Sequence, residues 1–120
     1  MMSNLNKFAQ KMFDAGVCDA RGAAFCATAV KLPDGSFGMV LIGVVGNDLS
    51  LYDTDMKSTV GEHLYTIPLK EVTDLQITSG MLAEIFKGYS FKFSYDGFEW
   101  KFKNCAQQKA QLAVIQSEAK

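Results

Sequence analysis

The sequence predicts an α+β fold that is mainly β: a partly open antiparallel barrel of seven strands in two sheets. A C-terminal helix closes the barrel, and an extra N-terminal helix precedes it. Three observations predict this fold. Apolar and polar residues alternate along several short stretches, as in strands with one buried face. Turn residues separate these stretches at short intervals. Apolar residues recur at helical spacing only near the two ends of the chain.

The composition indicates one folded domain, residues 1–120, because 120 residues with 48% apolar content suit a single core. The net charge of -1 gives no overall attraction to nucleic acid. The sequence has no apolar run of membrane-spanning length and no signal-peptide core. Its three cysteines are an odd count without paired spacing, as in reduced thiols. We therefore expect a cytoplasmic protein without a transmembrane segment.

The first predicted helix covers residues 1–16. Phe8 and Met12 recur at helical spacing, so they share one face of this helix. Ser3 is the expected N-cap. Gly16 is the expected stop, because glycine readily adopts the left-handed conformation that ends helices.

Two longer strands are predicted next, over residues 23–32 and 37–46, on either side of a turn at 33–36. If Leu32 pairs with Phe37, both faces of this hairpin are apolar. One face then carries Thr28, Val30, Phe37, Met39 and Leu41; the other carries Phe25, Ala27, Ala29, Val40, Ile42 and Val44. A sheet with one solvated side does not need two apolar faces. We expect the second set to contact the N-terminal helix, with the two alanines allowing close approach, or another subunit.

The middle of the chain is predicted to form three shorter strands. They cover residues 49–53, 63–68 and 72–78. In the last of these strands, the apolar residues switch from one face of the strand to the other, which indicates a bulge or turn near residues 73–74. The polar stretch 54–62 is expected to be a mobile loop. For residues 79–88, a short helical turn and an irregular strand start both remain open.

The final hairpin has the clearest local signal. Strands 89–95 and 98–103 flank Asp96 and Gly97, and this pair favours a type I′ turn, which needs positive φ at both positions. The turn predicts that Tyr95 faces Phe98, Phe93 faces Trp100 and Phe91 faces Phe102, with all six rings on one face. Asn104 is expected to cap the closing helix, residues 104–119.

The other face of this hairpin is rich in lysine. In the predicted register Lys92 lies opposite Lys101, with Lys103 nearby and Lys87 just upstream. Like charges that face each other destabilise a sheet, so the arrangement is consistent with a site for an anion or an acidic partner. A solvated face with mobile lysines, helped by Glu99, explains the same residues. The sequence favours the solvated face, and the site for an anion or an acidic partner stays open as the alternative.

Three stretches resemble the pattern of bacterial pleckstrin-homology-like (PH-like) and GRAM-like domains. They are VVGNDLSLYD (44–53), LYTIPLKEVTDLQI (64–77) and GYSFKFSYDGFEWKF (88–102), and the resemblance spans about residues 23–117. It implies a domain that binds phosphoinositides, phosphopeptides or proteins, or that assembles. Familiar lipid-binding PH domains carry a basic cluster on the first two strands, where this sequence has only Lys31 beside Asp34. No lipid-site residue is therefore carried over.

No motif for catalysis, a cofactor or a metal is present in the sequence. His63 is the only histidine, and no cysteine lies in a motif with it. Cys105 alone has a reason for a lowered pKa, because it is expected at a helix start. A small, half-buried apolar side chain is nevertheless the favoured role for this residue. The glycines form no phosphate loop, and the carboxylates are scattered through turns. We predict no catalytic residue, no cofactor and no metal site.

The function expected from the sequence is a non-catalytic interaction or assembly module. Its partner is a protein or a second copy of the chain, and nucleic acid is not expected. The first alternative is a domain that binds anionic lipid or phosphate through Lys87, Lys92, Lys101 and Lys103. The second is a small ligand-binding barrel or enzyme with a pocket at His63 or Cys105.

Overall fold

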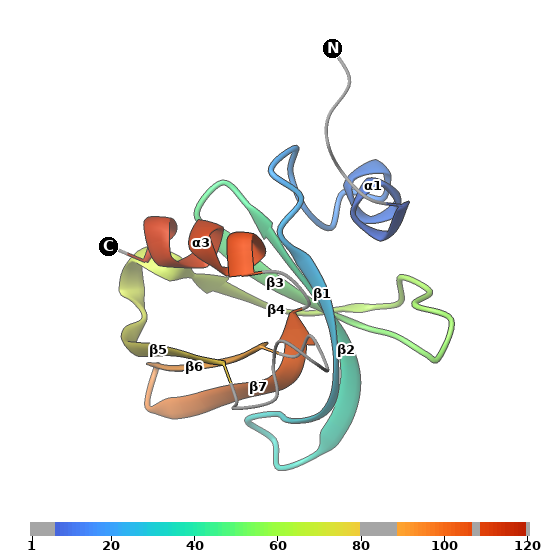
Figure 1. Cartoon of the computed structure of the whole chain (residues 1–120). Helices are drawn as coiled ribbons and strands as arrows, with labels where there is room; N and C mark the ends of the chain where they lie inside the picture. Colours follow the sequence, from blue (N-terminus) through green and yellow to red (C-terminus); the bar gives the residue numbers. More distant parts are fainter. Residues whose placement is uncertain (1–6, 80–88, 107–108, 120) are drawn as a thin grey trace.

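The structure is a computed structural model that describes residues 7–79, 89–106 and 109–119 (Figure 1). The elements are α1 (Lys7–Asp14), β1 (Ala24–Lys31), β2 (Phe37–Val45), β3 (Asp48–Asp53), β4 (His63–Pro68), η1 (Leu69–Glu71), β5 (Thr73–Ser79), β6 (Tyr89–Tyr95), β7 (Phe98–Ala106) and α3 (Lys109–Glu118). All pairings are antiparallel, in sheets ordered β1-β2-β3-β4 and β5-β6-β7. The predicted fold class, seven strands in two sheets with a helix at each end, is confirmed.

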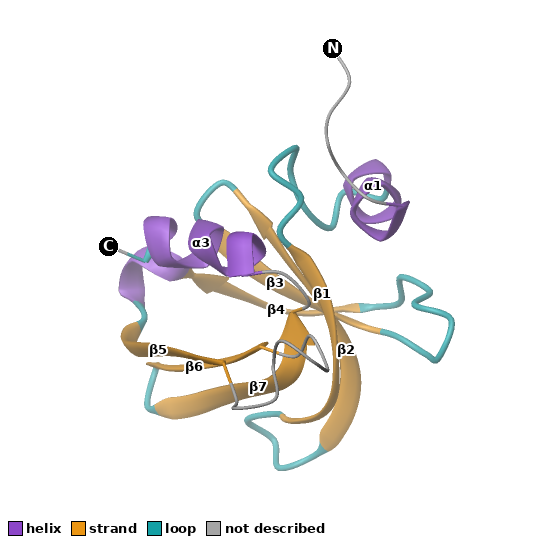
Figure 2. Ribbon diagram, in the orientation of Figure 1, coloured by secondary structure: helices purple, strands orange, loops and turns teal. Residues whose placement is uncertain are grey.

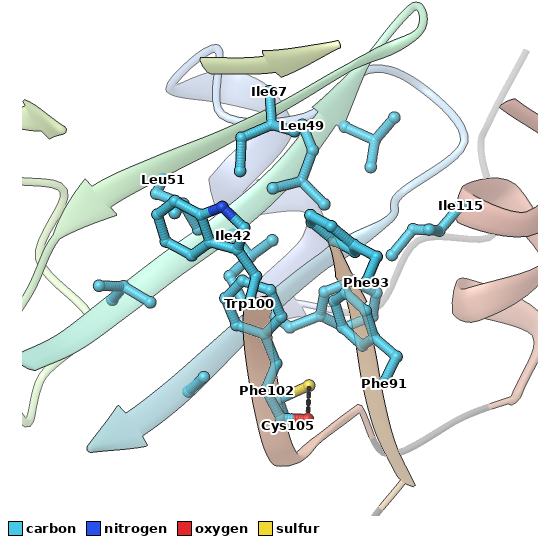
Figure 3. Close-up of a cluster of buried hydrophobic side chains, with 14 of the residues drawn as sticks. Ile42, Leu49, Leu51, Ile67, Phe91, Phe93, Trp100, Phe102, Cys105 and Ile115 are labelled. Carbon is cyan, nitrogen blue, oxygen red and sulfur yellow. Dashed lines mark hydrogen bonds between the residues drawn. The ribbon is translucent and has the colours of Figure 1, made fainter. Parts of the chain in front are cut away.

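The two sheets curve around a common interior, with α3 across one end and α1 outside the barrel beside the start of β1 (Figures 1 and 2). The main core contains side chains from both sheets and from α3. Its aromatic part is the predicted set, since Phe93 pairs with Trp100 and Phe91 with Phe102. The rings of Phe91 and Phe102 stack with centroids 4.8 Å apart (Figure 3). Full burial of such side chains stabilises the fold by about 1.5–3 kcal/mol each.

The turn of this hairpin fixes its register. Asp96 and Gly97 have φ of 51° and 78°, as a type I′ turn requires. Tyr95 then lies opposite Phe98, and Lys92 lies opposite Lys101. The predicted register is confirmed at every pair.

The end of the hairpin corrects a prediction. β7 continues to Ala106, which pairs with Tyr89, and α3 begins at Lys109. Asn104 therefore lies in a strand, and the helix predicted over 104–119 starts five residues too early. The reason is tertiary, because the start of β6 provides a partner for this part of β7 and Cys105 packs into the main core.

The first hairpin corrects a second prediction. Lys31, not Leu32, pairs with Phe37, and the register shifts between Ala27 and Val30. Ala29 has φ of 54° at this bulge. The bulge moves Val30 onto the core face and leaves Ala29 exposed.

The assignment of the two faces of this hairpin was also wrong. The residues Phe25, Ala27, Val40, Ile42 and Val44 lie in the main core, in the same buried cluster as Leu112 and Ile115 of α3. Of the six residues that were expected to contact the N-terminal helix, only Ala29 lies outside this core. The bulky members fill the barrel, so the face that α1 covers is the opposite one.

That opposite face forms a second, smaller core. Its buried members are Met12, Val17, Cys18, Ala24 and Leu41, with Phe8, Cys26, Tyr52 and Val60 partly buried around them. The close approach occurs at Gly43 of β2, because an added Cβ there would lie 2.6 Å from Cγ1 of Val17. The expectation that the N-terminal helix covers one apolar face is confirmed, on the other side of the hairpin.

The predicted helix stop is confirmed at Gly16, which has φ of 81°. Its N–H donates to the carbonyl of Phe13 at 3.1 Å, and the N–H of Val17 donates to Met12 at 2.8 Å. This pair of bonds is a Schellman motif, and it turns Val17 back onto the second core. The predicted N-cap, Ser3, lies outside the described residues.

The middle strands agree with the predicted ranges to within one residue. The expected irregularity in β5 is present, because Asp74 has φ of 57° and the register shifts between Thr73 and Gln76. The loop 54–62 is hydrogen-bonded internally and to α1: Nζ of Lys11 lies 3.4 Å from the carbonyl of Ser58. The uncertain segment 79–88 lies, except for Ser79, outside the described residues.

Candidate functional site

The outward side of β5, β6 and β7 carries a polar surface that we call the lysine face. Its residues are Gln76 and Thr78 of β5, Ser90 and Lys92 of β6, and Glu99, Lys101 and Lys103 of β7. They alternate with residues whose side chains are buried in the main core, such as Phe91 and Phe102. Because successive strand residues point to opposite sides, the lysine face points out of the barrel.

Two lysines face each other at the centre of this surface. Gln76 pairs with Lys92, and Lys92 pairs with Lys101, so the three form one row across the sheet. The lysine side chains are 41% and 57% exposed. Like charges directly opposite each other destabilise a sheet by a few tenths of a kcal/mol to about 1 kcal/mol. The row is therefore maintained at some cost to stability.

Glu99 lies between these two positive charges. Its carboxylate is 3.4 Å from Nζ of Lys101 and 4.0 Å from Nζ of Lys92. Exposed ion pairs contribute about 0.2–1 kcal/mol, so Glu99 offsets part of the repulsion. For Lys103, no ion pair is found within the described part of the chain. Lys87, the fourth predicted member, lies outside the described residues.

The lysine face encloses a pocket that is partly open to solvent. Its volume is about 100 Å³, and it is lined by Gln76, Thr78, Ser90, Phe91, Lys92, Lys101, Phe102 and Lys103. Small-molecule sites usually have volumes of about 300–1,000 Å³. The pocket thus has room for a small group. Its polar side chains carry hydrogen-bond donors, but most of its exposed lining is apolar.

His63 lies on β4, in the other sheet. Its Nε2 is 2.7 Å from Oγ1 of Thr66, and its ring meets Tyr52 edge-on at 5.2 Å. Within the described ranges, no three His, Cys, Asp or Glu side chains are grouped to hold a metal ion. These contacts give His63 a hydrogen-bond partner and a packing partner on its own sheet.

The pKa of each of the three cysteine thiols is raised, not lowered. Burial raises the pKa of the Cys105 thiol to about 12. Burial, and then the charge of Asp19, raise the pKa of Cys18 to about 11. Burial also raises the pKa of Cys26. The expected position of Cys105 at a helix start was wrong, because the residue lies in β7. The role that the sequence favoured for it, a small apolar side chain, agrees with its place in the main core, where a thiolate is poorly solvated.

Sequence reasoning missed a charged cluster that joins the connector after α1 to α3. Arg21, in the connector after α1, lies 2.7 Å from Asp19 and 2.7 Å from Glu118 of α3. Arg21 also donates to the carbonyl of Gly46 at 2.6 Å. The hydrogen bond from Arg21 lowers the pKa of Asp19 to about 2. The only local signal is an Asp and an Arg two residues apart, which says nothing about Glu118.

In the part of the chain that the structure describes, no helix is long and apolar enough to cross a membrane.

No protein-family model matches this chain, and no curated protein matches it. Among solved structures, it is similar to Inner Membrane Complex (IMC) Sub-compartment Protein 3 (ISP3) from Toxoplasma gondii. The sequence identity is 17% and the TM-score is 0.47, over 97% of this chain and 86% of that chain. A similarity at this level transfers neither residues nor function.

Proposed function

We propose that this chain is a non-catalytic interaction module that binds an acidic protein partner through the lysine face. The observation that carries the proposal is the pairing of Lys92 with Lys101, two exposed like charges held opposite each other. The three lysines and one glutamate of this face give it a local charge of +2, although the chain as a whole has a charge of -1. An acidic partner would remove the repulsion, so binding and relief of strain act together.

The resemblance to bacterial PH-like domains supports the same proposal, because many domains of that kind bind other proteins. Family membership, and with it a bacterial cytoplasmic setting, is part of the proposal. The buried thiols, whose pKa values are raised, support a module that acts without covalent chemistry. The side chains that fill the barrel interior favour a surface site over a ligand held inside it.

An anionic membrane is the second candidate, because the same lysines would be attracted to lipid phosphates. The distribution of exposed apolar residues favours a protein. Phe13, Phe37, Val45 and Met56 are the large exposed apolar residues of the described chain, and they lie on α1, β2 and the loop 54–62. None of these four residues lies on β5, β6 or β7, the strands that carry the lysine face, where a membrane-docking surface would be expected to place an apolar anchor.

The test compares two triple variants with the same change in net charge. Lys92→Gln, Lys101→Gln and Lys103→Gln together remove the lysine face. Lys31→Gln, Lys57→Gln and Lys70→Gln remove three exposed lysines elsewhere. Binding of fluorescent poly-L-glutamate is measured by anisotropy at low salt. We expect the first variant to bind about tenfold more weakly than the parent, and the second to bind nearly as well.

Equal weakening in both variants would show a non-specific charge effect and would overturn the proposal. Vesicles of phosphatidylcholine with phosphatidylserine form a second arm of this test. Binding to these vesicles without binding to poly-L-glutamate would select the membrane candidate instead. Self-association is checked by sedimentation of the parent and of both variants: a dimer that only the first variant loses would identify the acidic partner as a second copy.

A further inference from the structure

We infer that α1 and α3 are coupled: α1, docked on the second core, holds α3 closed over the end of the barrel, and Arg21 is the contact that joins them. α3 covers this end with Leu112 and Ile115, which are fully buried in the main core. In Figure 1 the connector, residues 15–23, runs between the two helices. Displacement of α1 should therefore loosen α3, and loosening of α3 should release α1.

The position of α1 determines where the connector begins. Met12 is fully buried in the second core, and the N–H of Val17 donates to the Met12 carbonyl at 2.8 Å. The thiol of Cys18 donates to the carbonyl of Ala9 at 3.8 Å. Val17 and Cys18 are buried in the same core as Met12. Because a helix of 8 residues is not stable alone, α1 and the start of the connector dock and leave together.

The next residues of the connector build the contact to α3. The Asp19 carboxylate accepts a hydrogen bond from the N–H of Gly46 at 2.9 Å, and two from the Arg21 guanidinium at 3.0 and 2.7 Å. This fork fixes the plane of the guanidinium, whose Nη1 donates to the Glu118 carboxylate at 2.7 Å. Asp19 directly follows the residues that are buried with α1. When those residues leave the second core, Asp19 moves with them, and Arg21 loses the support that directs it at Glu118.

α3 depends on this contact because of the charges in its last turn. The carboxyl end of a helix is negative, yet the last turn of α3 contains no basic side chain and ends in Glu118. Arg21 supplies the positive charge from outside the helix. Near the start of α3, the side-chain amide of Gln111 donates to the carbonyl of Ala24 at 3.4 Å. Both ends of α3 are thus attached to one short segment, which follows the part of the connector that docks with α1.

The size of the coupling is set by an ion pair that is partly exposed. The side chains of Arg21 and Glu118 are 36% and 23% exposed. Ion pairs of this kind change an equilibrium constant by about two- to fivefold. Displacement of α1 should change the opening equilibrium of α3 by this factor, and linkage requires the same factor in the other direction. A change at α1 therefore alters the closure of the barrel end.

Amide hydrogen exchange of the full chain in native buffer, followed by NMR, tests the coupling. α1 is loosened by Met12→Ala or, more mildly, by Ala9→Gly, which lowers the helix propensity. We expect both variants to raise the exchange rate of the α3 amides about threefold through local opening. Two controls should leave this rate unchanged: Phe13→Ala, at the exposed position next to Met12, and Val30→Ala, in the main core near the other end of β1.

Arg21→Gln tests whether this residue transmits the effect. It should raise the exchange of the α3 amides about threefold by itself, and Met12→Ala should add no further increase in its background. The reverse direction uses Ile115→Val, which loosens α3 from the main core. This variant should raise the exchange of the α1 amides by a similar factor, and the rise should disappear in the Arg21→Gln background.

Three outcomes would each overturn the inference. The first is unchanged exchange of the α3 amides in both Met12→Ala and Ala9→Gly. The second is an equal rise in Val30→Ala, which would show a general loss of stability. The third is a rise that persists in the Arg21→Gln background, which would show that Arg21 does not join the helices. None of these variants changes the lysine face, so the result is independent of the proposed acidic partner.

Discussion

At the residue scale, Gly43 is the position where the smallest side chain decides the packing. The connector after α1 crosses β2 at this point, and Cγ1 of Val17 would lie 2.6 Å from an added Cβ, with the Val17 carbonyl closer still. The N–H of Asp19 donates to the carbonyl of Val44 at 3.0 Å, which fixes the connector against the strand. Only glycine, which has a hydrogen atom in place of a side chain, fits between these two backbone segments.

Gly43→Ala is expected to destabilise the fold by about 2–3 kcal/mol, because the connector must move away from β2. The matched control is Gly38→Ala in the same strand, where an added Cβ meets nothing within 4 Å. The control should leave the free energy of unfolding unchanged or raise it by about 0.5 kcal/mol, because alanine reduces the conformational entropy of the unfolded chain. Urea unfolding followed by tryptophan fluorescence measures both. Equal stability of the two variants would contradict the close contact at Gly43.

At the element scale, α1 is short and stabilised by what it covers. An isolated helix of 8 residues is not stable in water, so its structure depends on tertiary packing. Met12 is fully buried in the second core, whereas Phe13, the next residue, is 41% exposed. The Schellman motif at its end and the contact of Lys11 with the loop 54–62 orient the helix.

Met12→Ala is expected to lower the free energy of unfolding by about 2–4 kcal/mol, because it opens a cavity between α1 and the hairpin. Phe13→Ala removes a larger side chain from a more exposed position and should cost less than Met12→Ala. Thermal unfolding by circular dichroism compares the two variants. A larger loss for Phe13→Ala would mean that the helix packs with a different face against β1 and β2.

At the scale of the whole molecule, the Arg21 cluster joins the connector after α1, the turn between β2 and β3, and α3. Arg21 and Glu118 are 97 positions apart in sequence. The pKa of Asp19 is lowered from 3.8 to about 2, first by the hydrogen bond from Arg21 and then also by the backbone of Gly46. A carboxyl whose pKa is lower in the folded chain stabilises the fold above its unfolded pKa.

This stabilisation should be present above about pH 4 and should disappear as the pH falls towards 2. Asp19→Asn is expected to cost about 1–2 kcal/mol at pH 6, a value reduced for the partial exposure of the group. The difference between Asp19→Asn and the parent should shrink as the pH falls through this range. Urea unfolding at several pH values measures it, with Asp48→Asn, at the start of β3, as a surface control. A difference that is constant down to pH 2 would rule out the ionic contribution.

The lysine face was predictable because its geometry is local. Asp96 and Gly97 fix the turn, and the period of two then determines which residue faces which. The alternation of rings and lysines along the two strands indicated that the rings would turn inward and the lysines outward. The pocket was not predictable, because Gln76 and Thr78 reach it from β5, whose bulge sets its register with β6.

The sequence by itself determined where the seven strands lie along the chain, the register of the last hairpin and the pairing of Lys92 with Lys101. These features depend on residues that are close together in the chain. Only the tertiary structure decided which face of the first hairpin lies inside, how far β7 extends, and that Arg21 meets Glu118. Both faces of that hairpin are apolar, so the pattern alone cannot choose between them. The choice comes from the fit of Val17 over Gly43 and of the bulky residues into the barrel, and these contacts join distant parts of the chain.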